Sequence, residues 1–327
     1  MRIASFIAAG ALALAALPET ADAALVEFQS FTGNVALSTD GFGSTTDIGT
    51  ISASVPEGST VVAAYLYTAT NWGTPTPTDL TLGGTTVTYD TTVPNDTACC
   101  SLASHRADVT AIVSAVIDGG AGGVYDFAVN EGTLGYGIDG SALVVVYSNP
   151  TLPTASVGIL DGFASVDGDT TAINFAEPLD TTNPDFFAEM VLGIGFSCCG
   201  QSSTVEVNGT LITANAGNND DGTVVADGSL ITVGSFDDPF SALLPGYEED
   251  HERYDLAAYV TNGDTSIQIA TANASGDDNI FLAAFYVSGE AGFNEPPPAT
   301  VPLPASALLF GSAFAGLFGL RRFRKAA

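Results

Sequence analysis

The sequence predicts an all-β protein, and two features of its 327 residues support this. From about residue 24 to residue 292, short runs rich in β-branched and aromatic residues alternate with turns rich in Gly, Thr, Ser, Asn and Asp. No long amphipathic helical pattern interrupts these runs, and only a short helix at residues 109–117 is indicated. The clearest expected strands are 60–69, 142–147, 155–160, 204–207, 230–233, 266–270 and 280–287.

The first segment has the composition of a secretory signal peptide. Arg2 precedes an apolar stretch from Ile3 to Leu17, and the small-x-small tripeptide that ends at Ala23 is typical of a cleavage site. We expect cleavage after Ala23, so that residues 1–23 are removed on export. A buried N-terminal helix is the weaker alternative, because polar, strand-like sequence follows at once.

The body of the chain is long for one sandwich, and it resembles itself. Three gapless matches occur in the same order in each half: residues 82–88 with 207–213, 106–113 with 253–260, and 137–147 with 276–286. We interpret them as a tandem duplication that gives two related β-sandwich-like domains. The expected domains are residues 24–151 and 152–292, with the boundary in the turn-rich segment 150–153.

The two basic residues of the body occupy equivalent positions in the second match. Arg106 lies two residues before Asp108, and Arg253 lies two residues before Asp255. In so acidic a chain, an arginine at a repeated position is expected to pair with a nearby carboxylate or with strand carbonyl groups and to fix a loop. The alternative is an arginine that binds a ligand such as a carboxylated sugar.

The charge of the body limits its partners. Without the signal peptide and the C-terminal basic cluster, two basic and 35 acidic residues remain, a formal charge of about −33. Such a field repels nucleic acid and anionic lipid and attracts cations. An acidic coat that keeps an extracellular protein soluble is the simpler interpretation, and binding of cation-bridged polysaccharide is the alternative.

Four cysteines form two adjacent pairs, Cys99-Cys100 and Cys198-Cys199. In an exported protein they suggest two disulfides. Because a bond between sequence neighbours strains the intervening peptide, we expect bonds from one pair to the other. Each bond would close a loop of about 100 residues, a contribution of up to about 4.7 kcal/mol in the chain-entropy model. A zinc site of four thiolates is the alternative, but its cysteines normally stand two to four residues apart.

No catalytic motif is present: the sequence lacks a nucleophile elbow, an H-E-x-x-H motif, a P-loop and a dinucleotide fingerprint. We therefore expect a protein that is not an enzyme and that needs no cofactor. Calcium is the one ion that its Asp-rich turns are suited to hold, and Asp220 and Asp221 are the first ligands to test. The carboxylates are too numerous for their spacing to single out the acid pair of a hydrolase.

The C-terminal segment has the parts of a membrane anchor. A Pro-rich linker at residues 293–300 favours an extended conformation and precedes an apolar run from Ser306 to Leu320. Because this run is short for a hydrocarbon core of roughly 30 Å, residues 301–304 must help to span it as a transmembrane helix. The basic cluster that follows is expected to stay in the cytoplasm, and it consists of Arg321, Arg322, Arg324 and Lys325.

The order of these parts resembles the VPLPA variant of the PEP-CTERM sorting signals of Gram-negative bacteria. The motif consists of Val301, Pro302, Leu303, Pro304 and Ala305, and the anchor and the basic cluster follow it within residues 301–327. The resemblance implies that an exosortase, a membrane protease, cuts near the motif and releases or transfers the exported part. It also implies a cell-surface or extracellular-matrix destination, with exopolysaccharide or the cell envelope as a partner.

Together these features predict an exported, acidic, non-enzymatic protein with a structural or adhesive role, held at the inner membrane by its tail until it is sorted. A calcium-dependent carbohydrate-binding module is a second hypothesis, in which Tyr65, Tyr67 or Trp72 stacks on sugar. An extracellular hydrolase is a third. Against the second hypothesis, Tyr and Trp at the end of a strand more often pack in a core or at its rim.

Overall fold

The structure is a computed structural model, and it describes residues 25–95, 100–133, 137–165, 168–196, 203–217, 230–241, 251–273 and 280–294. Within these ranges the all-β prediction is confirmed. One short α-helix, α1 (Thr110–Ile117), lies where the sequence indicated it, and one 3-10 helix, η3 (Ala257–Tyr259), occurs in the second half. No helix in the described ranges is long and apolar enough to cross a membrane. The expected signal peptide and C-terminal anchor lie outside the described residues.

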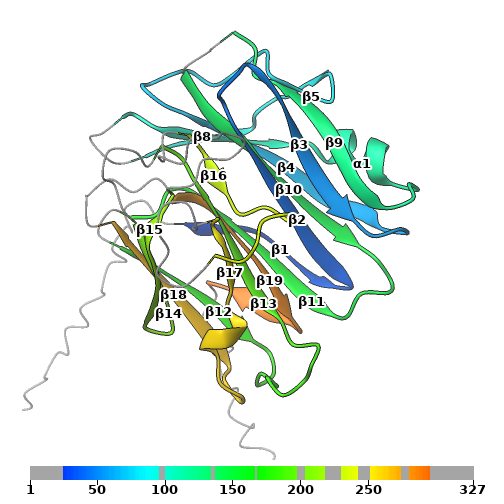
Figure 1. Ribbon diagram of the computed structural model, residues 1–327, viewed down its shortest axis with the longest axis vertical. Coiled ribbons are helices and arrows are strands. Elements are labelled where there is room, and N and C mark those ends of the chain that lie inside the picture. Colours follow the sequence, from blue (N-terminus) through cyan, green and yellow to red (C-terminus); the bar gives the residue numbers. More distant parts are fainter. Residues whose placement is uncertain are drawn as a thin grey trace, which may run out of the picture.

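Two antiparallel sheets form a first sandwich, in the upper part of Figure 1. The first of them, the β2 sheet, has the order β2 (Val35–Gly43), β10 (Ile138–Ser148), β4 (Thr60–Thr70), β8 (Ala103–Asp108) and β7 (Thr91–Pro94). Its partner, the β3 sheet, has the order β3 (Ile48–Val55), β9 (Gly123–Asn130), β5 (Thr81–Leu82) and β6 (Thr85–Thr86). Helix α1 buries Val113 and Ile117 in the core between these sheets.

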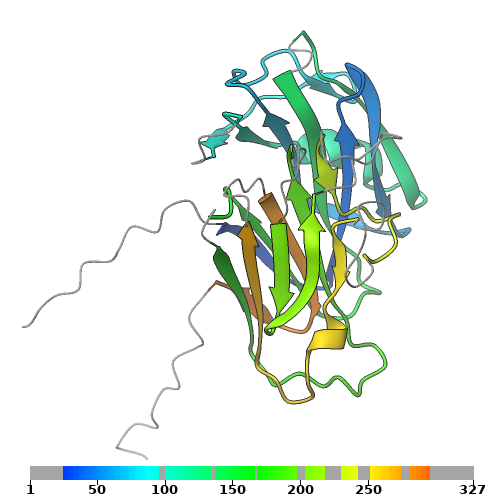
Figure 2. The same cartoon turned by 60° about the vertical axis from the view of Figure 1, so that its left-hand side comes forward.

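Two further sheets form a second sandwich, in the lower part of Figures 1 and 2. The β1 sheet has the order β1 (Val26–Gly33), β11 (Ala155–Asp161), β19 (Ile280–Ser288), β13 (Ala188–Ile194) and β16 (Thr232–Val233), and β17 (Arg253–Asp255) also pairs with β13. The β12 sheet has the order β15 (Thr210–Ala216), β14 (Ser203–Val207), β18 (Ser266–Asn273), β12 (Asp169–Phe175) and β20 (Ala291–Phe293).

A third apolar core joins the two sandwiches. On β10, Leu143 and Val145 face the core of the first sandwich, whereas Val144 and Val146 point the other way and meet side chains of the β1 sheet such as Ile159. Side chains alternate between the two faces of a strand, so the strands at this junction need apolar residues on both faces. That requirement explains why they appear in the sequence as unbroken apolar runs.

The N-terminal strand crosses from one half of the chain to the other. β1 precedes every strand of the first sandwich, yet it pairs antiparallel with β11, with Phe31 opposite Val157. The chain then enters β2 in the first sandwich after Gly33 and Asn34. The segment expected to be a separate first domain therefore supplies an edge strand to the sheet of the second half.

The two halves use the same strand order. In the β2 sheet it is β2-β10-β4-β8, and in the β1 sheet it is β11-β19-β13-β17. The order β3-β9-β5-β6 likewise corresponds to β12-β18-β14-β15. The second sequence match also corresponds in detail: Asp108 accepts a 2.9 Å hydrogen bond from the N–H of Thr110, and Asp255 accepts one of 2.9 Å from the N–H of Ala257.

The third sequence match is wrong in its register. The gapless match aligned Ile138 with Asp277, but strand pairing gives another alignment. Arg106 lies opposite Tyr67 and Arg253 lies opposite Val191, so Tyr67 and Val191 correspond, and so do Thr70 and Ile194, three residues further along β4 and β13. Ile138 lies opposite Thr70 and Ile280 lies opposite Ile194, which makes Ile138 equivalent to Ile280. The true alignment is shifted by three residues. An odd shift turns every side chain to the opposite face of a strand. The gapless match therefore aligned Leu143, which faces the core inside the first sandwich, with Leu282, which faces the third core between the sandwiches.

Candidate functional site

Arg106, on β8, joins the two sandwiches. Its guanidinium donates hydrogen bonds to the carboxylate of Asp161, at the end of β11, and at 2.9 Å to the hydroxyl of Thr91. The same group lies 3.4 Å from the centroid of the Phe28 ring on β1, a cation–π contact. Tyr67 donates a 3.1 Å hydrogen bond to the same Asp161 carboxylate. Arg106 thus holds segments of both halves in one cluster.

Arg253, on β17, makes comparable contacts within the second sandwich. Its Nε donates a 2.7 Å hydrogen bond to the carboxylate of Glu189 on β13. Its Nη1 donates to the main-chain carbonyl groups of Asp238 at 2.8 Å and Phe236 at 3.3 Å. The guanidinium also lies 4.5 Å from the centroid of the Phe240 ring. These contacts fasten the segment 236–240 to β13, so both body arginines are engaged with carboxylates.

The structure does not bring the two histidines together. His105 is buried on β8, with Nδ1 2.9 Å from the hydroxyl of Thr92 and Nε2 3.0 Å from that of Thr70. Burial lowers the pKa of His105 to about 4, so this imidazole is neutral at pH 7. His251 precedes β17, with Nδ1 3.8 Å from a carboxylate oxygen of Asp238.

Two carboxyl groups that the sequence did not single out are shielded from water in the first sandwich: Glu131 is buried and Asp40 is half-buried. Asp40, on β2, accepts a 2.5 Å hydrogen bond from the N–H of Ser52 on β3, and burial raises its pKa to about 7. Glu131 accepts hydrogen bonds from the hydroxyls of Ser44 and Ser141, and burial raises its pKa to about 7 as well. A raised carboxyl pKa is typical of a catalytic acid, but these two groups bind donors that belong to the fold.

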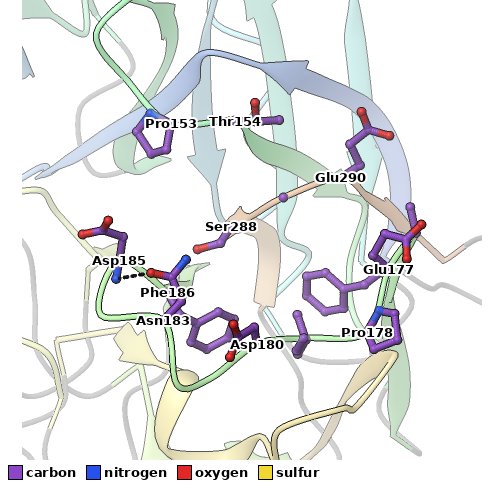
Figure 3. Close-up of a pocket in the computed structure, with 14 residues that line it drawn as sticks. Pro153, Thr154, Glu177, Pro178, Asp180, Asn183, Asp185, Phe186, Ser288 and Glu290 are labelled. Atoms are coloured by element: carbon purple, nitrogen blue, oxygen red, sulfur yellow. Dashed lines mark hydrogen bonds between the residues drawn. The ribbon is translucent and has the colours of Figure 1, made fainter.

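A cavity of about 440 Å³ opens at one end of the second sandwich, where β12 and β19 end and β11 begins (Figure 3). Phe175 and Leu179 are buried beneath it, and Phe186 is half-buried. The carboxylates among its lining residues belong to Glu177, Asp180, Asp185 and Glu290, and no basic residue lines it. Such a lining disfavours an anion.

A strained corner lies where β4 ends. The N–H of Thr74 donates a 3.0 Å hydrogen bond to the carbonyl of Asn71 and closes a four-residue turn. Trp72, the second residue of the turn, has a left-handed φ of 56°, and its side chain is 63% exposed. The indole meets the ring of Phe196 edge to face, with centroids 5.3 Å apart and planes at 77°.

The same corner contains the one cysteine that belongs to the described residues. Cys100 is disulfide-bonded, and its partner lies outside the described ranges, as do Cys99, Cys198 and Cys199. Phe196 stands two residues before Cys198 and contacts Trp72, whose N–H is hydrogen-bonded to the carbonyl of Cys100. The chain just before the second cysteine pair therefore lies close to the first pair. Bonds from one pair to the other remain a prediction.

Among the described residues, no group of three or more His, Cys, Asp or Glu side chains is placed to hold a metal ion. The expected calcium ligands Asp220 and Asp221 lie outside the described residues, as do the sorting motif at 301–305 and the basic cluster at 321–325.

Comparison with known proteins assigns no family. No protein-family model matches the sequence, and no curated protein shows significant similarity to it.

Sequence reasoning missed three features that the structure reveals. The cavity is built from segments near residues 153, 180 and 289, which no local pattern connects. The shielding of Asp40 and Glu131 from water follows from the approach of distant segments and has no local signal either. The turn at Trp72 did have one, because a glycine follows the tryptophan and glycine is common where φ is positive.

Proposed function

We propose that this chain is an exported, acidic, non-enzymatic protein of the cell surface or extracellular matrix, with a structural or adhesive role. The observation that carries this proposal is the C-terminal tail, in which the motif at residues 301–305, an apolar run and a basic cluster occur together and in order. In this proposal an exosortase-like protease recognises the tail, and the anchor holds the protein at the inner membrane until it is cut. The signal-peptide-like residues 1–23 agree with export.

We also infer that the body arose by tandem duplication of one β-sandwich-like domain, with the boundary near residue 151. The corresponding strand orders of the two halves support this origin. The third core and the crossing of β1 support the view that the two domains act as one stiff body. Such a body suits a protein whose role is to fill or bridge space outside the cell.

The electrostatics favour a partner that is not anionic. Arg106 and Arg253 are the only Lys or Arg residues of the body, and each is already paired with a carboxylate. The remaining carboxylates therefore set the sign of the surface field. The partner that we propose is exopolysaccharide that is neutral or bridged by cations. The acidic surface repels nucleic acid, which is therefore excluded as a partner.

Fractionation of a host that makes the protein, with and without its sorting protease, tests the proposal. We expect the mature protein in the surface or medium fraction, with a C-terminus near residues 301–305 by mass spectrometry. Without the protease, the intact tail should remain in the membrane fraction. The joint change Pro302→Ala and Pro304→Ala should block processing, whereas Pro296→Ala and Pro297→Ala in the linker should not. Unprocessed protein that stays in the cytosol would refute the proposal.

The two competing functions make different predictions. A calcium-dependent module should melt at a higher temperature in millimolar calcium and at a lower one in chelator, and Asp220→Asn with Asp221→Asn should abolish that shift. A hydrolase should turn over a glycan or an ester and depend on one essential carboxylate. Asp40 and Glu131, whose pKa values are raised, are the first carboxyl groups to replace in that test.

A further inference from the structure

Trp72 is an unusual residue for the backbone conformation that it adopts. It and Gly73 are the central residues of the turn that starts at Asn71, and their φ values of 56° and 69° give the type I′ pattern. Asn, Asp and Gly are favoured at such positions because a larger side chain on Cβ is strained in the left-handed conformation. The backbone alone would therefore favour Asn at position 72.

The strained turn is braced from a distant segment. The N–H of Trp72 donates a 2.6 Å hydrogen bond to the carbonyl of Cys100, and the N–H of Gly73 donates one of 3.1 Å to the carbonyl of Ser101. Cys100 and Ser101 are themselves left-handed, with φ values of 65° and 46°, and Cys100 is fixed by its disulfide. Strain that the surrounding structure over-determines is characteristic of ligand-binding and catalytic sites.

Packing does not account for the indole. The side chain is 63% exposed, and its one aromatic contact among the described residues is the edge-to-face one with Phe196. The preceding residue, Asn71, is only 5% exposed, and its side-chain oxygen has no hydrogen-bond partner among the described residues. An unmatched buried polar atom is rare in native proteins, and it often marks a site of strain, a functional group, or the position of an ordered water or ion. The corner therefore combines an exposed ring with an unmatched acceptor.

The size and charge of this corner select the ligand. A stable protein interface buries roughly 800 Å² on each partner, far more than the indole provides with its exposed neighbours among the described residues, Gly73, Pro75 and Ser101. A sugar ring is close to an indole in size, and the C–H groups on one face of it carry slight positive charge that suits the negative face of an aromatic ring. With Arg106 and Arg253 already paired, no body arginine remains to neutralise an acidic sugar.

We propose that Trp72 is an aromatic platform that binds a neutral sugar ring of a polysaccharide. The proposal deepens the surface or matrix function proposed above and rests on it, because that location supplies the polysaccharide. In this site the braced turn holds the indole rigidly toward solvent, so little side-chain entropy is lost when the sugar stacks on it.

Fluorescence gives a direct test because Trp72 is the only tryptophan in the chain. The mature protein is titrated with cellohexaose, chitohexaose and maltohexaose, which are neutral, and with oligogalacturonate, which is anionic. We expect a saturable blue shift of the Trp72 emission with at least one neutral oligosaccharide and none with oligogalacturonate. No shift with any neutral oligosaccharide would overturn the proposal. A shift that grows with protein concentration alone would also overturn it, because a second copy would then cover the ring.

Trp72→Asn is the decisive variant because asparagine fits the left-handed turn and lacks the ring. Retention on the immobilised sugar identified by the titration should fall at least tenfold, while the melting temperature stays the same or rises. Phe240→Leu, which changes another exposed aromatic residue, should leave retention unchanged. Unchanged retention of Trp72→Asn would overturn the proposal, because the sugar would then bind without the ring. A clear drop in its melting temperature would also count against it, because the ring would then have a structural role. Either result leaves the sorting experiment unaffected, so the two proposals can fail separately.

Discussion

At the residue scale, the ion pair between Arg106 and Asp161 shows how strongly the stability of the fold can depend on one side chain. An intact pair of this kind adds little net stability, but removal of one partner leaves the other charge desolvated. Asp161 is only 8% exposed, and Tyr67 is its other neighbour in the cluster. We expect Arg106→Gln to lower the free energy of unfolding by about 2 to 3 kcal/mol, measured by urea denaturation.

Two companion variants separate the ion pair from general damage. Adding Asp161→Asn to Arg106→Gln should recover part of the loss, because two amides can hydrogen-bond without an unpaired charge. Arg253→Gln should cost less, about 1 kcal/mol, because Glu189 is more exposed to water and can be rehydrated. An unchanged urea midpoint for Arg106→Gln would show that the pair is not needed.

At the element scale, β11 is packed on both faces, and Gly158 marks the point where no side chain fits. A Cβ at this position would lie 2.5 Å from the ring of Phe293 on β20. Phe293 is fully buried and stacks on Phe285, with ring centroids 5.8 Å apart. Gly158→Ala should therefore push β20 away and lower stability by about 1 to 3 kcal/mol, seen in urea denaturation and in faster amide exchange of β20.

Making Gly158→Ala in a second variant, one that lacks the Phe293 ring, tests whether the clash with that ring is the cause. Phe293→Ala alone removes a buried ring and should cost about 3 to 5 kcal/mol. In that variant the added methyl group of Gly158→Ala has room, so its further cost should be small. Equal effects of Gly158→Ala in both backgrounds would mean that the glycine is needed for another reason, such as the path of the strand.

The elements that the sequence predicted are those whose signal is local. The β-branched runs at 60–69 and 266–270 are strands. The turn-forming dipeptides within the matched segments, Gly83-Gly84 in 82–88 and Asn208-Gly209 in 207–213, make a hairpin in each half. The register of the third match could not be found in this way. β10 and β19 are apolar on both faces, so neither run contains the alternation that distinguishes one register from another.

Contacts between segments that are distant in the sequence could not be predicted for a related reason. That Arg106 would pair with a carboxylate could be expected from the acidic composition, but its partner Asp161 belongs to the other sandwich. The pairing of β1 with β11 depends on a core between the sandwiches that no single segment encodes. The candidate ring Trp72 was visible in the sequence, whereas its strained backbone depends on contacts with Cys100 and Ser101.

At the scale of the whole molecule, buried titratable groups set how stability varies with pH. The pKa values of Asp40 and Glu131 are about 7, above their ordinary values of 3.8 and 4.5, because both are buried. The folded state therefore keeps protons that the unfolded chain has lost, and stability falls as pH rises toward 7. His105 acts in the opposite sense, but only between its folded pKa of about 4 and its ordinary value of 6.5.

The most informative window is from about pH 7 to pH 8, because the surface carboxylates are ionised there and His105 of the unfolded chain, with its ordinary pKa of 6.5, has lost most of its protons. We expect the melting temperature to fall across this window at constant ionic strength. Glu131→Gln should flatten the fall and melt above the wild type at pH 8, since the amide has no proton to lose and can still bond with the hydroxyls of Ser44 and Ser141. Glu57→Gln, on an exposed turn, should keep the wild-type slope. A wild-type melting temperature that rises across the window would mean that these two carboxyl groups are ionised in the fold at little cost.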